Sequence, residues 1–334
     1  MTDQIDTTRL SAQLRSRGVD LEHQRLLITR FTGSEQEEDL TEPANCGGFG
    51  RIRHFQRTTS LGWPSNPLPI EPACRALEMA EQEVLRAQVF QNAICNWRCW
   101  YCYVPFELLS ANLRYSSWFT ATELLELYLK EENPPRVIDL SGGQPDLVPE
   151  WIIWMLEEVR LRGLEKEVYL WSDDNLSNDY FWRYLSATEV RRLAESRNYG
   201  RVCCFKGFDE KSFAFNTMAK DSLFNQQFEL FERLLETGMD VYAYVTMTTP
   251  DEENVPKRIA AFMDKLQDLH INLPLRTIPL EIRHFTPLHS RLGKEQVKAF
   301  NIQHLAIAAW QRELEDRFSD QQLGLPIVDV SLRK

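Results

Sequence analysis

The chain has 334 residues, of which 43% are hydrophobic and 26% are charged, and its formal net charge is −11. This composition is that of a globular protein, and a chain of this length can bury a core as one large domain or two smaller ones. The acidic balance disfavours wrapping a nucleic acid backbone, which needs a basic surface, so no nucleic-acid partner is expected. The sequence has no run of about eighteen apolar residues, and the N-terminus MTDQIDTTRL lacks the pattern of a signal peptide. We therefore expect a cytoplasmic protein without a membrane partner.

Residues 1–85 are expected to form an N-terminal extension. Leu10 and Leu14 share one helical face and Gly18 follows, which predicts a short helix. Segment 25–31 is β-prone, and the glycine-rich segment 45–55 is interpreted as a turn in preference to a loop that approaches an active site. Four prolines between residues 64 and 72 predict an extended connector, and a helix is expected from Pro72 to about Arg86.

From about residue 86, apolar strands alternate with amphipathic helices. Strands are expected at 89–94, 136–141, 167–172, 201–206, 241–248 and 276–284, and helices at 122–131, 150–162, 178–196, 222–237 and 255–269. This alternation predicts right-handed β-α-β units and a parallel sheet, either a partial barrel or a doubly wound sheet. Segment 294–318 predicts a closing helix, and 324–334 a tail that could add a strand.

The most informative stretch is CNWRCWYC, which places Cys95, Cys99 and Cys102 within eight residues. Thiolates this close on one loop can face a single metal centre, and iron–sulfur clusters are held by cysteines at similar spacings. A [4Fe–4S] cluster with three cysteine ligands keeps one iron open, whereas a structural zinc would need a fourth ligand that the neighbouring residues do not supply. The remaining cysteines are scattered and are expected to be small buried side chains: Cys46, Cys74, Cys203 and Cys204.

This loop resembles the signature of the radical S-adenosylmethionine (radical SAM) superfamily, Cys-x3-Cys-x-aromatic-Cys, with Tyr101 at the aromatic position. The segment RVIDLSGGQPDL resembles the family's strand that ends in Gly-Gly-Glu-Pro, with Gln144 where glutamate is usual. The resemblance covers about residues 88–287. It implies a partial (β/α)6 barrel at 86–290, preceded by the extension at 1–85 and followed by a C-terminal helix and tail at 291–334.

The resemblance further implies a [4Fe–4S] cluster on the three cysteines and S-adenosylmethionine bound at the open iron. In α/β barrels the active site lies at the carboxyl ends of the strands, and each motif here follows a predicted strand. Glycine lets backbone approach a ligand closely, and glutamine keeps an acceptor oxygen without the charge of glutamate. The implied cofactor-binding residues are Tyr101, Gly142, Gly143, Gln144, Asp173, Asn175 and Lys206. Core packing of Tyr101, helix capping by Asp173 and Asn175, and an internal ion pair of Lys206 are the alternatives.

Strand alternation places Tyr242, Tyr244 and Thr246 on one face of the strand at 241–248 and Ala243 on the other. We expect the apolar face to meet helices and the hydroxyl-bearing face to line a polar lumen that binds the substrate. Arg283 is a further substrate-facing candidate, since it could bind a carboxylate or phosphate; an internal ion pair explains it equally well.

The resemblance thus implies an oxygen-sensitive enzyme that reductively cleaves S-adenosylmethionine to a 5′-deoxyadenosyl radical, which removes hydrogen from a small-molecule or protein substrate. An external one-electron donor such as flavodoxin or ferredoxin is implied as a partner. The motif order is most similar to the enzymes that activate glycyl radical proteins, so such an activase is one alternative. An iron–sulfur electron carrier or sensor is another, although a carrier needs four protein ligands and this loop supplies three.

Overall fold

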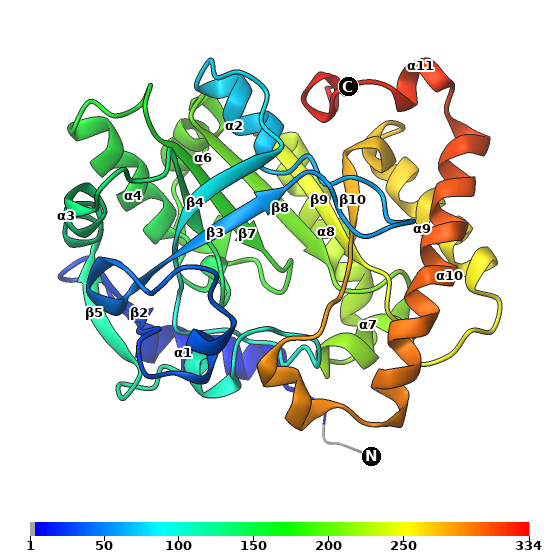
Figure 1. Cartoon of the computed structure of the whole chain (residues 1–334), viewed down its shortest axis with the longest axis horizontal. Helices are drawn as coiled ribbons and strands as arrows, with labels where there is room; N and C mark the ends of the chain where they lie inside the picture. The colour runs from blue at the N-terminus through cyan, green and yellow to red at the C-terminus, as the bar shows by residue number, and fades with distance from the viewer. Residues whose placement is uncertain (1–3, 334) are drawn as a thin grey trace.

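The computed structural model describes residues 4–333, and its main feature is a seven-stranded sheet that curls into a half-barrel (Figure 1). The strand order is β10-β9-β8-β7-β6-β4-β3. Six strands are parallel: β4 (Val84–Phe90), β6 (Val137–Leu140), β7 (Tyr169–Asp174), β8 (Tyr199–Phe205), β9 (Val241–Thr246) and β10 (Thr277–Leu280). The seventh, β3 (Gly50–Gln56), runs antiparallel to β4. The predicted α/β fold with a partial barrel is confirmed.

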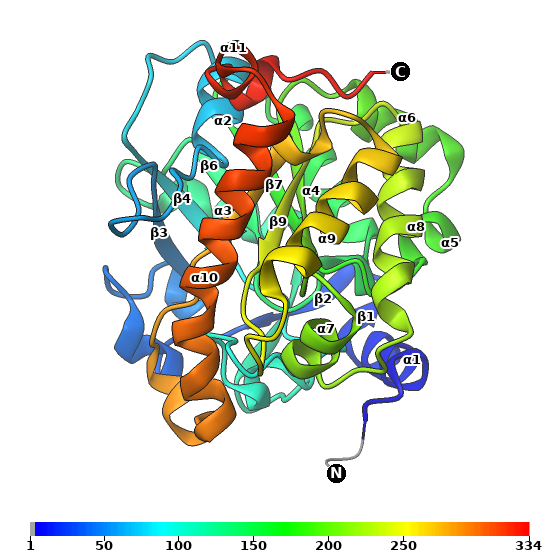
Figure 2. The same ribbon diagram turned by 90° about the vertical axis from the view of Figure 1, so that its right-hand side faces the viewer.

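Helices follow the parallel strands and cover the convex face of the sheet, where Figure 2 shows α8, α9 and α10 side by side. Helix α9 begins and ends as predicted because its apolar residues recur along one helical face. The predicted helix at 178–196 is instead two helices, because Ser186 starts a new one with a capping box to Glu189. The bounds are α3 (Ala121–Lys130), α4 (Glu150–Leu161), α5 (Tyr180–Tyr184), α6 (Ala187–Glu195), α7 (Glu210–Thr217), α8 (Leu223–Glu236), α9 (Val255–Leu269) and α10 (Lys294–Arg317).

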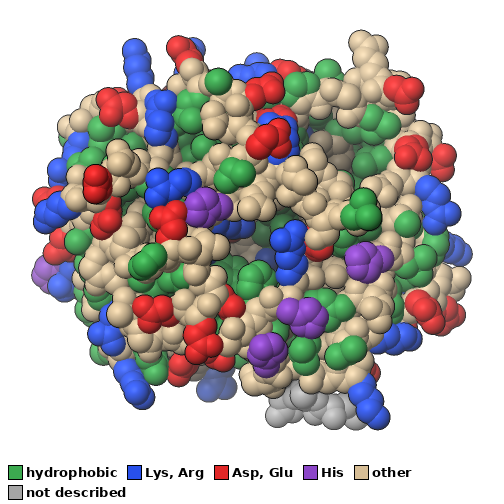
Figure 3. Space-filling model, in the orientation of Figure 1, with side chains coloured by type: hydrophobic (Ala, Val, Ile, Leu, Met, Phe, Trp, Pro, Cys, Tyr) green, Lys and Arg blue, Asp and Glu red, His purple; other side chains and the backbone are tan. Residues whose placement is uncertain are grey.

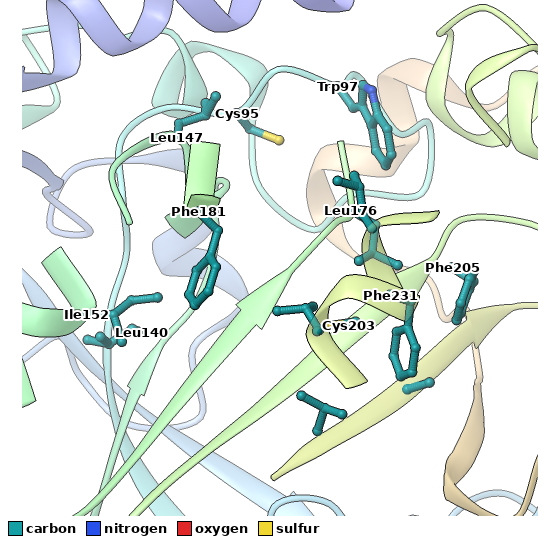
Figure 4. Close-up of a cluster of buried hydrophobic side chains, with 14 of the residues drawn as sticks. Cys95, Trp97, Leu140, Leu147, Ile152, Leu176, Phe181, Cys203, Phe205 and Phe231 are labelled. Atoms are coloured by element: carbon teal, nitrogen blue, oxygen red, sulfur yellow. The ribbon is translucent and has the colours of Figure 1, made fainter. Parts of the chain in front are cut away.

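The main hydrophobic core lies between the sheet and these helices. Leu140, Cys203 and Phe205 leave the strands toward Ile152 and Phe231 of the helices, as Figure 4 shows. Alternate residues of each strand point to opposite faces, and the helix-facing apolar residues of β4, β6, β7, β8 and β9 contribute to this core. Removal of apolar surface from water here, at roughly 25 cal/mol per Å², holds the helices on the sheet.

A second apolar cluster fills the inside of the half-barrel at the amino ends of the strands. Helix α2 (Ile70–Ala76) packs there against Trp171 and Tyr242, whose ring centroids are 5.8 Å apart. Because Tyr242 lies in this inner cluster and Ala243 in the outer core, the predicted faces of β9 are confirmed. The expectation of a polar lumen is wrong at the level of Tyr242, because aromatic and aliphatic side chains occupy this end.

The N-terminal extension takes part in the main sheet through β3, although the glycine-rich sequence at 45–55 predicted a turn there. It also contains α1 (Thr7–Gly18), confirmed as a helix, and a small sheet formed by β1 (Val19–Asp20), β2 (Arg25–Thr29) and β5 (Ser116–Thr120). The predicted helix from Pro72 to Arg86 is wrong: α2 ends at Ala76, Glu78 has a positive φ of 52°, and β4 begins at Val84. Strand β4 ends at Phe90, whereas the predicted strand extended to residue 94, and β10 ends at Leu280, whereas the predicted strand extended to residue 284.

After α10 the chain forms α11 (Asp320–Leu323) and a 3-10 turn (Ile327–Asp329), and segment 324–333 adds no strand, contrary to expectation. None of the helices between residues 4 and 333 combines the length and apolarity that a bilayer crossing requires.

The two edge strands, β3 and β10, are not paired with each other within the described residues, so the half-barrel has an open side. At the carboxyl end of the parallel strands this gap is bridged by side chains. The carboxylate of Asp39 accepts hydrogen bonds from the backbone N–H (3.0 Å) and the hydroxyl (2.9 Å) of Thr286. Trp63 of the connector donates from its indole to the carbonyl of Pro279 on β10 (3.0 Å). The open side therefore has a defined rim.

Candidate functional site

The cysteine loop follows β4 at the carboxyl end of the sheet and is fixed by contacts to distant segments. The Trp100 indole donates to the side-chain oxygen of Asn216 (3.0 Å), and its backbone N–H donates to the Asn216 carbonyl (3.3 Å). From the other side, the Arg291 guanidinium donates to the carbonyl of Cys102 (2.6 Å). Hydrogen bonds to α7 and from the segment after β10 therefore hold the backbone of the loop in place.

The three thiols of the loop lie close enough to affect each other's ionisation. Burial raises the pKa of Cys99 to about 12, the Lys206 ammonium lowers it, and the thiols of Cys102 and Cys95 raise it. Between residues 4 and 333, no group of His, Cys, Asp and Glu side chains converges tightly enough to hold a single metal ion. A cluster differs from an ion because its ligands bind different irons, so the thiols around it need not meet at one point.

Gly142 and Gly143 follow β6 directly beneath the cysteine loop, with φ values of +74° and +65°. A Cβ on Gly143 would lie 2.3 Å from the carbonyl oxygen of Asn92 and 2.6 Å from that of Ile94. The backbone N–H of Gln144 donates to the same Ile94 carbonyl (2.7 Å). The structure thus gives Gly143 a role that the sequence did not suggest: it lets the motif pack against the backbone that leads into the cysteine loop. Contact with a cofactor stays a prediction.

Gln144 is buried, and its side-chain amide is engaged by the end of β7. Its Oε1 accepts from the backbone N–H of Asn175 (3.0 Å), and its Nε2 donates to the Asp174 carboxylate (2.7 Å). The acceptor oxygen that the sequence offered to a cofactor is therefore occupied within the protein.

Asp174 also belongs to a buried charge cluster that sequence reasoning missed. The Arg201 guanidinium on β8 pairs with Asp174 (3.0 Å) and with Asp146, which follows the glycine motif. Burial raises the pKa of Asp146 to about 7; the Arg201 charge opposes this rise and the Asp174 charge adds to it. The cluster connects the segment after β6 and the end of β7 to the first half of β8, on the helix-facing side. Charged residues near predicted strand ends were visible in the sequence, but their pairing was not.

Asp173 and Asn175 do not form one site, although Asp173 lies on β7 and Asn175 directly follows that strand, and neither caps α5, which begins after Asp179. Asn175 is buried beside the cysteine loop, with its Nδ2 3.8 Å from the Cys95 sulfur, and its Oδ1 has no hydrogen-bond partner. Asp173 faces the inside of the half-barrel. Burial and the charge of Asp139 raise the pKa of Asp173 to about 7.

Tyr101, Thr246 and Lys206 come together at the upper inside of the half-barrel. The Tyr101 and Thr246 hydroxyls share a hydrogen bond of 2.9 Å, which ties the cysteine loop to the end of β9. Burial disfavours the charge on Lys206, but the ionisable groups of Cys204, Tyr101 and Cys99 outweigh it and raise its pKa well above the usual value. A cation in this position favours ionised thiols on the loop.

The other substrate-facing candidates lie away from the loop. Tyr242 donates to Asp240 (2.9 Å) at the amino end of β9, and Tyr244 donates to Asn66 (3.2 Å) in the connector. Arg283 is exposed at the rim and pairs with Glu281 (2.6 Å), which matches its ion-pair alternative.

Three inward-pointing charged residues were missing from the prediction: Arg51 and Arg53 on β3, and Asp139 on β6. Arg53 pairs with Asp139 at 3.4 Å, and the Arg51 guanidinium donates to the Tyr103 hydroxyl at 3.3 Å. The available signal was an acid inside the apolar strand VIDL and two arginines two residues apart in GRIRHF.

No protein-family model and no curated protein matches the chain. Solved structures similar to it include SuiB of Streptococcus suis bound to the precursor peptide SuiA, with 15% identity over 53% of this chain and 36% of that one (TM-score 0.37). SuiB of Streptococcus suis bound to S-adenosylmethionine is 16% identical over 53% of this chain and 36% of that one (TM-score 0.38). Native anSMEcpe with bound AdoMet is 13% identical over 56% of this chain and 49% of that one (TM-score 0.39). The chain spans about a third to a half of the length of these structures. At such identities and TM-scores, the likeness establishes neither a family nor a function.

Proposed function

We propose that the chain is a radical SAM enzyme with a partial (β/α)6 barrel. Cys95, Cys99 and Cys102 would hold a [4Fe–4S] cluster at which S-adenosylmethionine is reductively cleaved. The observation that carries the proposal is the contact between the two motifs of the resemblance. They are far apart in sequence, yet the N–H of Gln144 donates to the carbonyl of Ile94, next to the first cysteine (2.7 Å). Both motifs lie at the carboxyl ends of parallel strands, where α/β barrels carry their active sites.

The residues at the site fit both groups chemically. Three thiols on one loop, with no fourth ligand beside them, suit a cluster with one open iron. The buried Oδ1 of Asn175 lacks a partner in the protein and lies on the side chain that contacts Cys95, so it is available to accept from an amino group. The Tyr101 ring is held by its hydrogen bond to Thr246 and offers apolar area to an adenine.

A bound cluster would supply the electron for reductive cleavage of S-adenosylmethionine to methionine and a 5′-deoxyadenosyl radical, which would abstract hydrogen from the substrate. The chain's own contribution is to bind, orient and exclude water. Lys206 favours the ionised thiols that metal binding requires. Trp100 packs with Ile282, Leu288 and Ala299 in an apolar cluster that covers the loop from the β10–α10 side. An external one-electron donor, such as flavodoxin or ferredoxin, would supply the electron.

The test is anaerobic reconstitution of the full chain with iron and sulfide, followed by assay of 5′-deoxyadenosine from S-adenosylmethionine and a reductant. Wild type should bind close to four irons per chain and form 5′-deoxyadenosine, and Cys99→Ala should do neither. Cys203→Ala is the matched control because Cys203 is a buried thiol on the helix-facing side of β8. A wild-type chain that binds a cluster and exchanges electrons but forms no 5′-deoxyadenosine would be an electron carrier, and would overturn the proposal.

A further inference from the structure

Five charged side chains line the inside of the half-barrel below the cysteine loop, and the proposed function assigns a role to only one of them, Lys206. We call this set the lumen charge cluster: Arg51, Arg53, Asp139, Asp173 and Lys206. Its members come from β3 and from the ends of β6, β7 and β8. Arg51 and Arg53 are two residues apart on one strand, so both point inward. Burial raises the pKa of Asp173, and the nearby charges of Arg53, Lys206 and Arg51 oppose this rise.

Among the basic members of the lumen charge cluster, Arg51 has a buried donor atom without a partner. It is only 9% exposed, and its Nε is a buried donor without a hydrogen-bond partner. Its guanidinium lies over the rings of Phe31 and Tyr103, with centroids at 5.8 and 5.4 Å, and donates to the Tyr103 hydroxyl (3.3 Å). Within residues 4–333 it makes no ion pair with a carboxylate. A buried cation without a counter-ion is unfavourable, so this arrangement indicates an anion from outside the chain.

The acidic members do not neutralise the cluster. Asp139 is fully buried; one of its oxygens accepts from Ser141 (3.1 Å) and pairs with Arg53 (3.4 Å), while its Oδ1 has no partner. Asp173 makes no hydrogen bond or ion pair in the described part of the chain. Three cations therefore face two carboxylates, and an excess of positive charge remains even when both acids are ionised. Burial raises the pKa of Asp139 above its usual value and that of Asp173 to about 7, so partial protonation of Asp173 increases this excess near neutral pH.

Part of the lumen charge cluster is open to solvent. The Arg53 side chain is 31% exposed, and Asp173 and Tyr101 are partly exposed. Figure 3 shows a hollow near the centre of this face, with Lys or Arg side chains inside it.

We propose that the lumen charge cluster is the substrate pocket, in which Arg51 and Arg53 bind an oxyanion of the substrate, either a carboxylate or a phosphate group. The identification of the ligand as the substrate rests on the proposed function. A guanidinium presents a planar fork of N–H donors that matches two oxygens of either group. The free Oδ1 of Asp139 would accept from an N–H or O–H of the same molecule. Because Tyr103 directly follows Cys102, a molecule held by Arg51 lies beside the cysteine loop, where hydrogen abstraction would occur.

The test measures anion binding by the full chain, with no cleavage of S-adenosylmethionine involved. Sodium acetate or inorganic phosphate is titrated at constant ionic strength set with chloride, and calorimetry and the thermal midpoint are followed. Wild type should bind at least one of the two anions, and Arg51→Gln should weaken that binding tenfold or more. Arg86→Gln is the control because Arg86 is exposed on β4 and pairs with Glu42, and it should bind like wild type. Arg51→Lys, which keeps the charge without the fork, should lie between them.

If only acetate binds, the substrate group held by Arg51 and Arg53 is a carboxylate. If only phosphate binds, it is a phosphate group. If neither anion binds to wild type, or if Arg51→Gln binds as tightly as wild type, the proposal is overturned. The carboxylate of S-adenosylmethionine is the competing source of an anion. If Arg51→Gln weakens S-adenosylmethionine binding to the reconstituted protein tenfold, Arg51 serves the cofactor and the substrate assignment falls. Absence of 5′-deoxyadenosine formation in wild type would overturn the proposed function separately, whatever the anion titrations show.

Discussion

Gly143→Ala should destabilise the protein and disrupt the cysteine loop. The residue has a φ of +65°, and an L-residue in the left-handed region costs about 1–2 kcal/mol. In addition, the new Cβ would lie 2.3 Å from the carbonyl oxygen of Asn92, where 3.4 Å is the lower limit of ordinary contact, so the backbone must move by about 1 Å. Overpacking of this kind costs about 1–3 kcal/mol, and the free energy of unfolding should fall by about 2–5 kcal/mol in total.

Gly163→Ala is the matched control for this prediction. Gly163 has nearly the same φ, +70°, but nothing lies within 4 Å of a Cβ built on it. It should lose only the backbone contribution of about 1–2 kcal/mol, so the difference between the two variants isolates the contact with the loop. The assays are the thermal midpoint and iron bound per chain after anaerobic reconstitution. Gly143→Ala should lose iron and Gly163→Ala should retain it, because only the former moves backbone that leads into Cys95.

Equal thermal midpoints and equal iron contents in the two variants would refute the reasoning, since the loop would then tolerate the added methyl group. A third result is also informative. If Gly143→Ala keeps its iron but binds S-adenosylmethionine more weakly, the glycine serves the approach of the cofactor, as the sequence interpretation had it, and loop packing is secondary.

Three further predictions concern buried polar groups. Arg201→Met should lower the free energy of unfolding by about 3–5 kcal/mol in chemical denaturation, because two carboxylates remain buried without their cation; a loss under 1 kcal/mol would contradict this. Tyr244→Phe removes a buried hydroxyl bonded to Asn66 and should cost about 1 kcal/mol, whereas a solvated lumen hydroxyl would cost nothing. Asp173 binds its proton more tightly in the folded state, with its pKa raised from 3.8 to about 7. Its stabilising contribution is therefore present below pH 3.8 and lost as the pH rises to 7. Asp173→Asn should accordingly gain stability relative to wild type between pH 4 and 7, and a pH-independent difference would exclude this.

The parallel part of the fold was predictable because its signals are local. Helix α9 buries one apolar face along its whole length, and β9 alternates between apolar and hydroxyl-bearing residues, so both could be located from short windows. Strand β3 was missed for a physical reason. Its inward positions carry Arg51 and Arg53, which serve the lumen and not an apolar core, so the alternation typical of a half-buried strand is absent. The charged inward positions of β3 are the reason that its strand pattern could not be recognised.

Contacts between residues far apart in the sequence limited how much of the candidate site could be predicted. The cysteine loop and the glycine motif could be placed at strand ends, because each follows a recognisable apolar strand. Asp146 and Arg201 are 55 residues apart, and no local pattern indicates that they form an ion pair. The same holds for Tyr244, whose hydroxyl contacts the connector 178 residues away in the sequence. Its inward direction followed from alternation, but its partner depended on how α2 and the connector fill the half-barrel.

Gln144, the position at which the motif departs from the family pattern, is explained by its neighbours. A glutamate there would place a second carboxylate where Nε2 now lies 2.7 Å from Asp174. Asp174 already shares Arg201 with Asp146, so no cation would remain to offset the repulsion. The glutamine amide converts this contact into a hydrogen bond, and its oxygen fixes the backbone of Asn175. If the proposed function is correct, the side-chain oxygen of Asn175 is the acceptor that remains free beside the cysteine loop. Gln144 would then act by holding the backbone of Asn175 in position.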